Sequence, residues 1–228
     1  MLPKLDIDRL LENSVTARRI YGIKLMIRDG LTDASKWFLF NREKLKYELD
    51  LKTGGIVLDI GAYKGQYTEK MHALNVDVIY WLYEPIVEYF QICKQLFFDK
   101  STIVIHQAAV SADGRDFEME VAGLRSRQAS GNWIDSVSIT SIDIQDIFDS
   151  AEEFELLKMN IEGMEYECLE RLIRSNSLIK AKYLLIQFHE LDEHSPSKLT
   201  KIHESISNDY TNIWKYQWMW ELWKRKAE

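Results

Sequence analysis

The sequence lacks several features that would assign its class directly. Its two cysteines, Cys93 and Cys168, do not have the paired spacing of a zinc site, so we expect reduced, unpaired thiols and a cytoplasmic location. No apolar run approaches the roughly 20 residues that cross a bilayer, and the N-terminus lacks the apolar stretch of a signal peptide. Basic residues are not in excess: the formal net charge of −7 disfavours nucleic acid as the main partner.

The 228 residues, 46% hydrophobic and 29% charged, suit one globular domain with a small appendage. Residues 1–50 carry aliphatic side chains at helical spacing between charges, which predicts an N-terminal helical cap. From residue 55, short apolar runs alternate with amphipathic stretches; the runs are 55–61, 76–84, 102–110, 154–162 and 182–190. This alternation predicts that residues 51–228 form an α/β fold, with a doubly wound, mostly parallel, seven-stranded sheet and helices on both faces.

The tail of the chain has a different pattern. Large apolar side chains occupy every second position, which is strand periodicity: Trp214, Tyr216, Trp218, Trp220 and Leu222. No helix-length segment separates the two halves, so the tail predicts a terminal antiparallel hairpin, an ending uncommon in dinucleotide dehydrogenases. The aromatic stripe could offer ring faces to a sugar, but we favour core packing because large aromatics fill hairpin faces well.

Residues 57–68, VLDIGAYKGQYT, run from a predicted strand through a turn into a helix. Gly61 stands where the chain turns sharply, and we expect Gly65 to let the helix approach the strand closely. The G-x-x-x-G spacing differs from the G-x-G-x-x-G of a dinucleotide site, so an NAD-dependent oxidoreductase is a disfavoured alternative. Asp59 would repel a pyrophosphate but attract an ammonium, such as that of a methionine moiety, directly or through water.

Two more strand ends suit an adenosine. Glu84 closes the second strand before Pro85, where a carboxylate can accept both ribose hydroxyls; capping of the next helix is the alternative. The third strand ends at HQAAV (106–110), where small residues and the amide of Gln107 suit a flat adenine. The two alanines are equally compatible with a core position.

Together these segments resemble the FkbM family of class I methyltransferases, which depend on S-adenosylmethionine. The matching pieces are VLDIGAYKGQYT (57–68), YEP (83–85), HQAAVSADG (106–114), SITSIDI (138–144), LKMNIEGMEYECL (157–169) and WELWKRK (220–226). The resemblance covers residues 50–228, and NIEGMEYECL is its family-specific part. It implies O-methylation of a hydroxyl on a sugar, glycan or natural-product acceptor, as in polysaccharide or natural-product biosynthesis.

The loop pattern and the resemblance predict that S-adenosylmethionine contacts Asp59, Gly61, Ala62, Tyr63, Gly65, Thr68, Glu84, Pro85, Gln107 and Ala108. Two positions depart from the family pattern: Asn160 replaces a usual aspartate, and Gln187 replaces a frequent glutamate. Asn160 can hydrogen-bond the methionine part or a substrate hydroxyl, but an amide cannot act as a general base. The departure leaves a divalent metal undecided and opens the alternative of a catalytically silent cofactor-binding module.

An alcohol acceptor must be aligned with the methyl group and must lose its proton. His189, at the end of the fifth strand, is the first candidate base because histidine titrates near neutral pH; a loop anchor is its alternative role. Glu162, beside Gly163, is the second candidate, and Glu165 reads as an ordinary first-turn helix acid.

An inserted hairpin around residues 114–140 is predicted between the third and fourth strands. Residues 122–133 within it combine glycines and small polar residues with Arg125, Arg127 and Trp133. This composition suits a substrate lid whose arginines hold an anionic acceptor, or equally a plain loop. The sequence leaves a homo-oligomer open.

Overall fold

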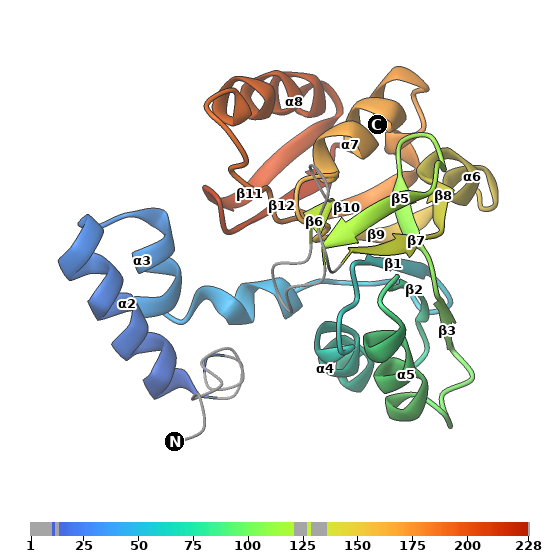
Figure 1. Cartoon of the computed structure of the whole chain (residues 1–228), viewed down its shortest axis with the longest axis horizontal. Helices are drawn as coiled ribbons and strands as arrows, with labels where there is room; N and C mark the ends of the chain where they lie inside the picture. Colours follow the sequence, from blue (N-terminus) through green and yellow to red (C-terminus); the bar gives the residue numbers. More distant parts are fainter. Residues whose placement is uncertain (1–10, 12–13, 121–126, 129–135, 228) are drawn as a thin grey trace.

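The main sheet of the chain has seven strands, in the order β11-β12-β10-β9-β1-β2-β3 (Figure 1). The computed structural model describes residues 11, 14–120, 127–128 and 136–227. The strands are β1 Ile56–Ile60, β2 Ile79–Tyr83, β3 Ile103–His106, β9 Phe154–Met159, β10 Ala181–Ile186, β11 Tyr210–Tyr216 and β12 Trp220–Arg225. Strands β3, β2, β1, β9 and β10 are parallel, whereas β12 runs antiparallel to both β10 and β11. The predicted, mostly parallel sheet with a terminal antiparallel hairpin is confirmed.

Helices cover both faces of the sheet, and each face has its own apolar core. On one face lie α6 (Ile144–Asp149), α7 (Glu165–Arg174) and α8 (Ser195–Asp209); on the other lie α4 (Gln66–Leu74) and α5 (Val87–Leu96) (Figure 1). Alternate residues of β1 enter the two cores: Leu58 and Ile60 the first, Val57 the second. Burial on both faces explains why the central strands read as nearly continuous apolar runs.

The apolar run 102–110 divides into two strands instead of one. After β3 the chain leaves the main sheet, and β4 (Ala109–Ser111) pairs in parallel with β8 (Ser141–Asp143) in a separate sheet. Between them, β5 (Phe117–Glu120), β6 (Arg127–Gln128) and β7 (Ser136–Ile139) form a small antiparallel sheet. These strands fall within the region where the sequence predicts an inserted hairpin.

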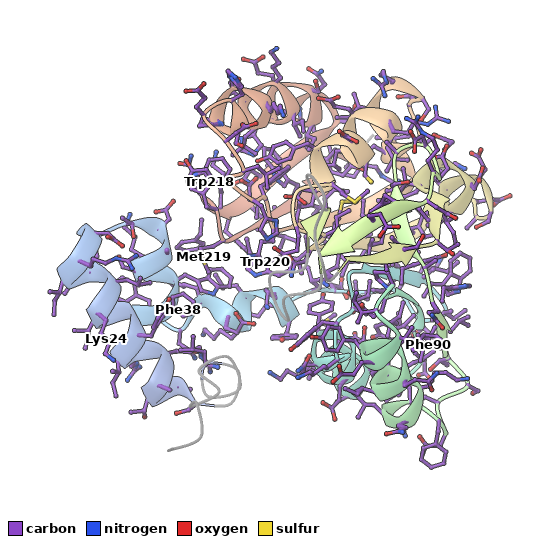
Figure 2. All side chains as sticks on the ribbon, viewed as in Figure 1. Lys24, Phe38, Phe90, Trp218, Met219 and Trp220 are labelled. Carbon is purple, nitrogen blue, oxygen red and sulfur yellow. The ribbon has the colours of Figure 1, made fainter. Side chains whose placement is uncertain are left out.

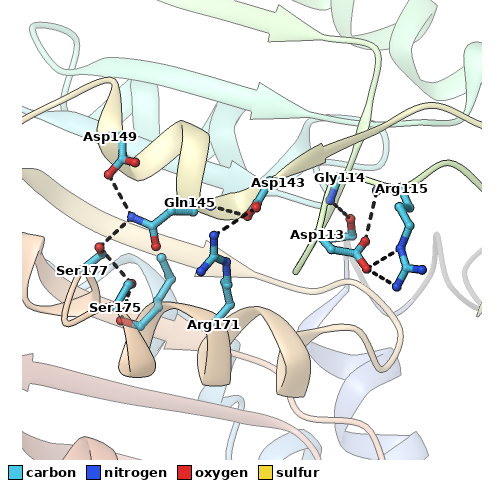
Figure 3. A network of polar contacts seen from close by, with 11 residues as sticks. Asp113, Gly114, Arg115, Asp143, Gln145, Asp149, Arg171, Ser175 and Ser177 are labelled. Atoms are coloured by element: carbon cyan, nitrogen blue, oxygen red, sulfur yellow. Dashed lines mark hydrogen bonds and ion pairs between the residues drawn. The ribbon is translucent and has the colours of Figure 1, made fainter.

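A polar network holds the short helix α6 against α7 (Figure 3). Asp143 caps α6 by accepting a hydrogen bond from the Gln145 backbone N–H at 2.8 Å, and it pairs with Arg171 of α7 at 3.4 Å. The Gln145 side-chain amide donates to Asp149 and to Ser177, both at 2.8 Å. These contacts link α6 to α7 and to the segment that follows α7.

The N-terminal region is helical, with α2 (Val15–Asp29), α3 (Asp33–Leu39) and a 3-10 turn, η1 (Arg42–Tyr47). Trp37 of α3 is buried against Trp214 and Tyr216 of β11, at ring-centroid distances of 5.9 and 5.4 Å. Phe38 and Met219 belong to the same apolar cluster, between the helical pair and the β11–β12 hairpin (Figure 2). Part of the predicted aromatic stripe therefore packs against the chain's own N-terminal helices.

Two further expectations concern membrane-spanning helices and the two cysteines. Within the described residues, no helix combines the length and apolar character needed to cross a membrane. Cys93 and Cys168 are both buried and unpaired, as the sequence predicts.

Candidate active site

One pocket opens at the carboxyl ends of β1, β2 and β9, with a volume of about 650 Å³ that includes space open to solvent. The carboxyl edge of a parallel sheet is where such folds bind ligands. Seven predicted site residues line it: Gly61, Tyr63, Glu84, Pro85, Ala108, Asn160 and Glu162. The rest of the lining is mostly apolar or aromatic, including Tyr83, Ile86 and Tyr89.

The loop after β1 forms the floor of this pocket. Gly61 has a φ of 79°, in the left-handed region that favours glycine, and a Cβ there would overlap the carbonyl oxygen of Asn160. The backbone N–H groups of Gly61 and Ala62 both donate to the Tyr83 carbonyl, at 3.0 and 3.1 Å. The loop is thus fixed to the ends of both neighbouring strands, with Ala62 buried behind it.

Gly65 directly precedes α4 and has a φ of 80°. The sequence predicts that its missing side chain lets the helix approach the strand, but the close neighbour is a different one. A Cβ at this position would lie 2.8 Å from the ring of Phe97, just beyond α5. The expected approach to the strand is therefore wrong: the missing side chain makes room for the α5 region, because α4 and α5 share one face of the sheet.

Asp59 lies beneath the loop, fully buried, and does not line the pocket. Its carboxylate accepts a hydrogen bond from the Thr68 hydroxyl at 2.6 Å and pairs with the Lys158 ammonium at 2.7 Å. Lys158 also donates to the Gly61 carbonyl at 2.7 Å. Asp59 and Thr68 therefore support the loop from below, in contact with a buried cation.

Lys158 is a site residue that the sequence analysis missed. It faces Asp59 directly in the register of β9 on β1 and is only 4% exposed. The available signal was a lysine inside an apolar run predicted to be buried on both faces, since a buried ammonium requires a partner charge.

Glu84 directly follows β2 and is 5% exposed at the pocket wall. Its two carboxylate oxygens accept hydrogen bonds from the backbone N–H groups of Tyr63 and Ile86, at 2.8 and 2.9 Å. Burial raises the pKa of Glu84 to about 7, although these backbone hydrogen bonds act in the opposite direction. The bond to Ile86 fixes the turn just before α5 but does not cap the helix, so the capping alternative is not what the structure shows.

Asn160 directly follows β9, where its backbone N–H donates to the Ile60 carbonyl at 3.0 Å. Its side-chain oxygen is buried, and none of the described residues donates a hydrogen bond to it. A buried acceptor without a donor is costly, so this oxygen is suited to a ligand N–H or O–H in the pocket. An ammonium group is the kind of donor that a methionine moiety would bring.

His189 follows β10 and lies between two carboxylates. Its Nδ1 is 2.9 Å from Glu165, and its Nε2 is 3.5 Å from Glu162, which lines the pocket. Burial lowers the pKa of His189, but the hydrogen bond and charge of Glu165, with the charge of Glu162, outweigh it, so the net pKa is raised. His189 itself does not line the pocket and is connected to it through Glu162.

Glu165 connects His189 to the loop that carries Glu162. At this position the sequence predicts only an ordinary acid in the first turn of the helix. The Glu165 side chain is fully buried and accepts hydrogen bonds from the backbone N–H groups of Gly163 and His189, both at 2.8 Å. It also contacts the His189 ring, so one carboxylate fixes both the loop of Glu162 and the histidine. Its burial depends on the packing of α7 against the strand ends, which sequence spacing alone does not give.

The remaining predicted residues lie elsewhere. Gln107 is exposed and does not line the pocket. Arg125 and Trp133 lie outside the described residues, and of Arg127 only the backbone, in β6, is described. The described part of the chain contains no group of three or more side chains placed to hold a metal ion.

Comparison with known proteins identifies the family to which the chain belongs. The chain matches the methyltransferase FkbM domain over residues 59–214, more than half of its length. A search of curated proteins found no match. Membership of this methyltransferase family implies that S-adenosylmethionine is the methyl donor.

Solved structures show the same fold. The chain is similar to a protein from Clostridium thermocellum provisionally assigned as an rRNA methylase, with a TM-score of 0.52 and 7% identity over 83% of this chain and 95% of that one. It is also similar to an rRNA methylase from Streptococcus thermophilus, with a TM-score of 0.50 and 10% identity over 82% of this chain and 95% of that one. At such identities the likeness concerns the fold alone.

The buried ion pair beneath the loop leads to a stability prediction. Lys158→Met leaves the Asp59 carboxylate buried without its cation, which costs about 3–5 kcal/mol in the free energy of unfolding. Asp59→Asn combined with Lys158→Met removes both charges and recovers most of that loss. Urea unfolding followed by circular dichroism measures both.

The matched control for this prediction is Lys100→Met, which breaks an exposed pair with Asp99 and changes stability by less than about 1 kcal/mol. A double variant as unstable as Lys158→Met alone would contradict the interpretation.

Proposed function

We propose an S-adenosylmethionine-dependent O-methyltransferase activity for this chain, which belongs to the FkbM family of methyltransferases. The observation that carries the proposal is the pair of acceptors in one pocket: the Glu84 carboxylate and the unpartnered side-chain oxygen of Asn160. Glu84 suits two ribose hydroxyls, and Asn160 suits an ammonium group. Gly61 keeps the backbone between them free of a side chain, and the small side chains of Ala108 and Ala109 in the lining suit adenine.

S-adenosylmethionine, when bound, supplies an electrophilic methyl group on its sulfonium. The chain's own residues must then align an acceptor hydroxyl with that methyl group and take its proton. Glu162 lines the pocket, and His189 lies behind it, so we propose that these two residues receive the proton as a coupled pair. The Glu165 carboxylate, on the other side of the imidazole ring, stabilises its positive charge.

The acceptor class rests on the family resemblance: a hydroxyl of a sugar, glycan or natural product. Arg125, Arg127 and Trp133 remain the predicted contacts of an anionic acceptor. A net charge of −7 does not favour a nucleic-acid acceptor, and rRNA is named only for the two structural neighbours.

A second candidate function is cofactor binding without turnover. Asn160 motivates it, because an amide replaces the aspartate usual in the family and cannot take a proton. Under the first proposal Asn160 only binds, and the proton goes to the Glu162–His189 pair. Methyl transfer to any hydroxyl acceptor therefore distinguishes the two candidates.

The cofactor assignment predicts a pH-dependent affinity for S-adenosylhomocysteine. Ribose hydroxyls donate to a carboxylate, and the pKa of Glu84 is raised by burial to about 7, so the protonated form binds poorly. Affinity measured by calorimetry should rise from about pH 6 to about pH 8, by up to roughly tenfold for each pH unit below the pKa. Glu84→Gln should bind weakly with no such dependence, whereas His189→Gln should keep it. A flat profile for the unaltered protein would refute the ribose contact.

The proton-transfer assignment predicts a shift in a pH–rate profile. Because His189 has a raised pKa, the protonated pair predominates at low pH, and kcat/KM should rise as pH increases through that pKa. Glu165→Gln removes the charge that raises this pKa, so the rise should move to lower pH and kcat should fall.

The measurement is the formation of S-adenosylhomocysteine with a panel of sugars, glycans and polyketide-like alcohols. Glu167→Gln, an exposed neighbour on α7, is the matched control and should leave the profile unchanged. If the protein binds the cofactor product but methylates no hydroxyl, the silent-module candidate stands instead. If Glu165→Gln leaves the profile in place, the assignment of the proton to this pair is wrong.

A further inference from the structure

Helix α2 carries an apolar stripe on the side opposite its contact with α3. Gly22 and Leu25 are buried, and a Cβ on Gly22 would lie 2.6 Å from the Leu39 backbone of α3. In contrast, Ile20, Ile23 and Ile27 are 51, 44 and 78% exposed. With Thr16, they follow the i, i+4, i+7, i+11 spacing of a single helix face. The described structure leaves this face uncovered.

Basic side chains lie on both edges of the stripe. At 3.6 residues per turn, Arg19 and Lys24 lie about 70° to either side of its centre. Both are exposed, and neither has an ion-pair partner in the described part of the chain. The helix carries four basic residues and one acidic residue, a net charge of +3. The whole chain has a net charge of −7, so everything outside α2 sums to −10.

We propose that the outer face of α2 docks on an anionic lipid bilayer. An apolar stripe with basic edges is the pattern of a helix that lies in the membrane interface, where the stripe enters the headgroup boundary and the cations meet anionic lipids. At 15 residues, α2 is too short to span a bilayer, and lying in its surface requires no greater length.

The arrangement of α2 in the molecule fits this orientation. The pair α2–α3 projects from the sheet, anchored through Trp37 to β11 (Figure 1). An anionic surface would repel the acidic body of the protein, whereas α2 offers a basic contact at a distance from it.

Charge also argues against a second copy of the chain as the occupant. If two stripes paired as a parallel coiled coil, Arg19 of one helix would face Lys24 of the other, and like charges at these flanking positions repel. The stripe also lacks the tryptophan and tyrosine side chains that usually dominate the affinity of protein interfaces.

The test is flotation of the full chain with vesicles of phosphatidylcholine alone and of phosphatidylcholine mixed with phosphatidylglycerol. The protein should float with the mixed vesicles, with an affinity that falls as salt is added, and should not float with phosphatidylcholine alone. Ile20→Ser with Ile27→Ser, and separately Arg19→Glu with Lys24→Glu, should each weaken vesicle binding by roughly tenfold or more.

Matched controls change similar residues elsewhere on the surface. Leu74→Ser with Phe98→Ser removes apolar side chains that are 66 and 85% exposed, and Lys198→Glu with Lys201→Glu reverses two exposed charges on α8. Both should bind vesicles like the unaltered chain. Far-UV circular dichroism of every variant verifies that the helices are intact.

Four results would overturn the proposal. The unaltered chain could fail to float with mixed vesicles, or the α2 variants could bind as well as the controls. Alternatively, light scattering could show a dimer that becomes a monomer in the Ile20→Ser, Ile27→Ser variant without vesicle binding, which would assign the face to a second copy. Vesicle binding that appears only after deletion of residues 1–13 would assign the face to that segment.

Discussion

The buried ion pair between Asp59 and Lys158 joins β1, which leads into the loop at the pocket floor, to the neighbouring strand β9. Both groups are withdrawn from water, so each depends on the other for its charge to be tolerated. The same ammonium holds the Gly61 carbonyl, and Thr68 binds the carboxylate from the start of α4. Loop, strands and helix are therefore fixed at one point beneath the pocket. The ion pair thus supports the geometry of the site above it.

Strand β9 also positions the part of the pocket wall that Asn160 and Glu162 form. Because Gly61 has no side chain, the Asn160 carbonyl can approach the loop, and the Asn160 side chain is held at the pocket wall. The chain then turns through Glu162, with a φ of 55°, and Gly163 into α7. Glu165 closes this turn and orients His189 from the next strand. The proposed cofactor contact Asn160 and the proposed proton acceptor Glu162 thus lie two residues apart, in the same segment as Glu165.

Most of the fold could be predicted from the sequence because strands buried on both faces and amphipathic helices leave distinct patterns. The apolar run 102–110 misled, since an apolar pattern does not reveal that the chain changes sheets after His106. Residues at strand ends, such as Gly61, Glu84 and Asn160, were predictable because topology brings those ends together. The sequence signals that Lys158 is buried, but the partners of Lys158 and Glu165 come from cross-strand register and helix packing, which the sequence pattern does not give. The separation of Gln107 from the pocket likewise depends on local backbone direction.

The central claim is that the pocket between β1, β2 and β9 holds S-adenosylmethionine. A crystal structure of the full chain with S-adenosylhomocysteine tests this claim most directly. The account predicts ribose hydroxyls hydrogen-bonded to Glu84, adenine beside Ala108, and the ligand's ammonium within hydrogen-bond distance of the Asn160 side-chain oxygen. Ligand bound elsewhere, or bound here with its ribose away from Glu84 and the Asn160 oxygen still without a donor, would contradict it.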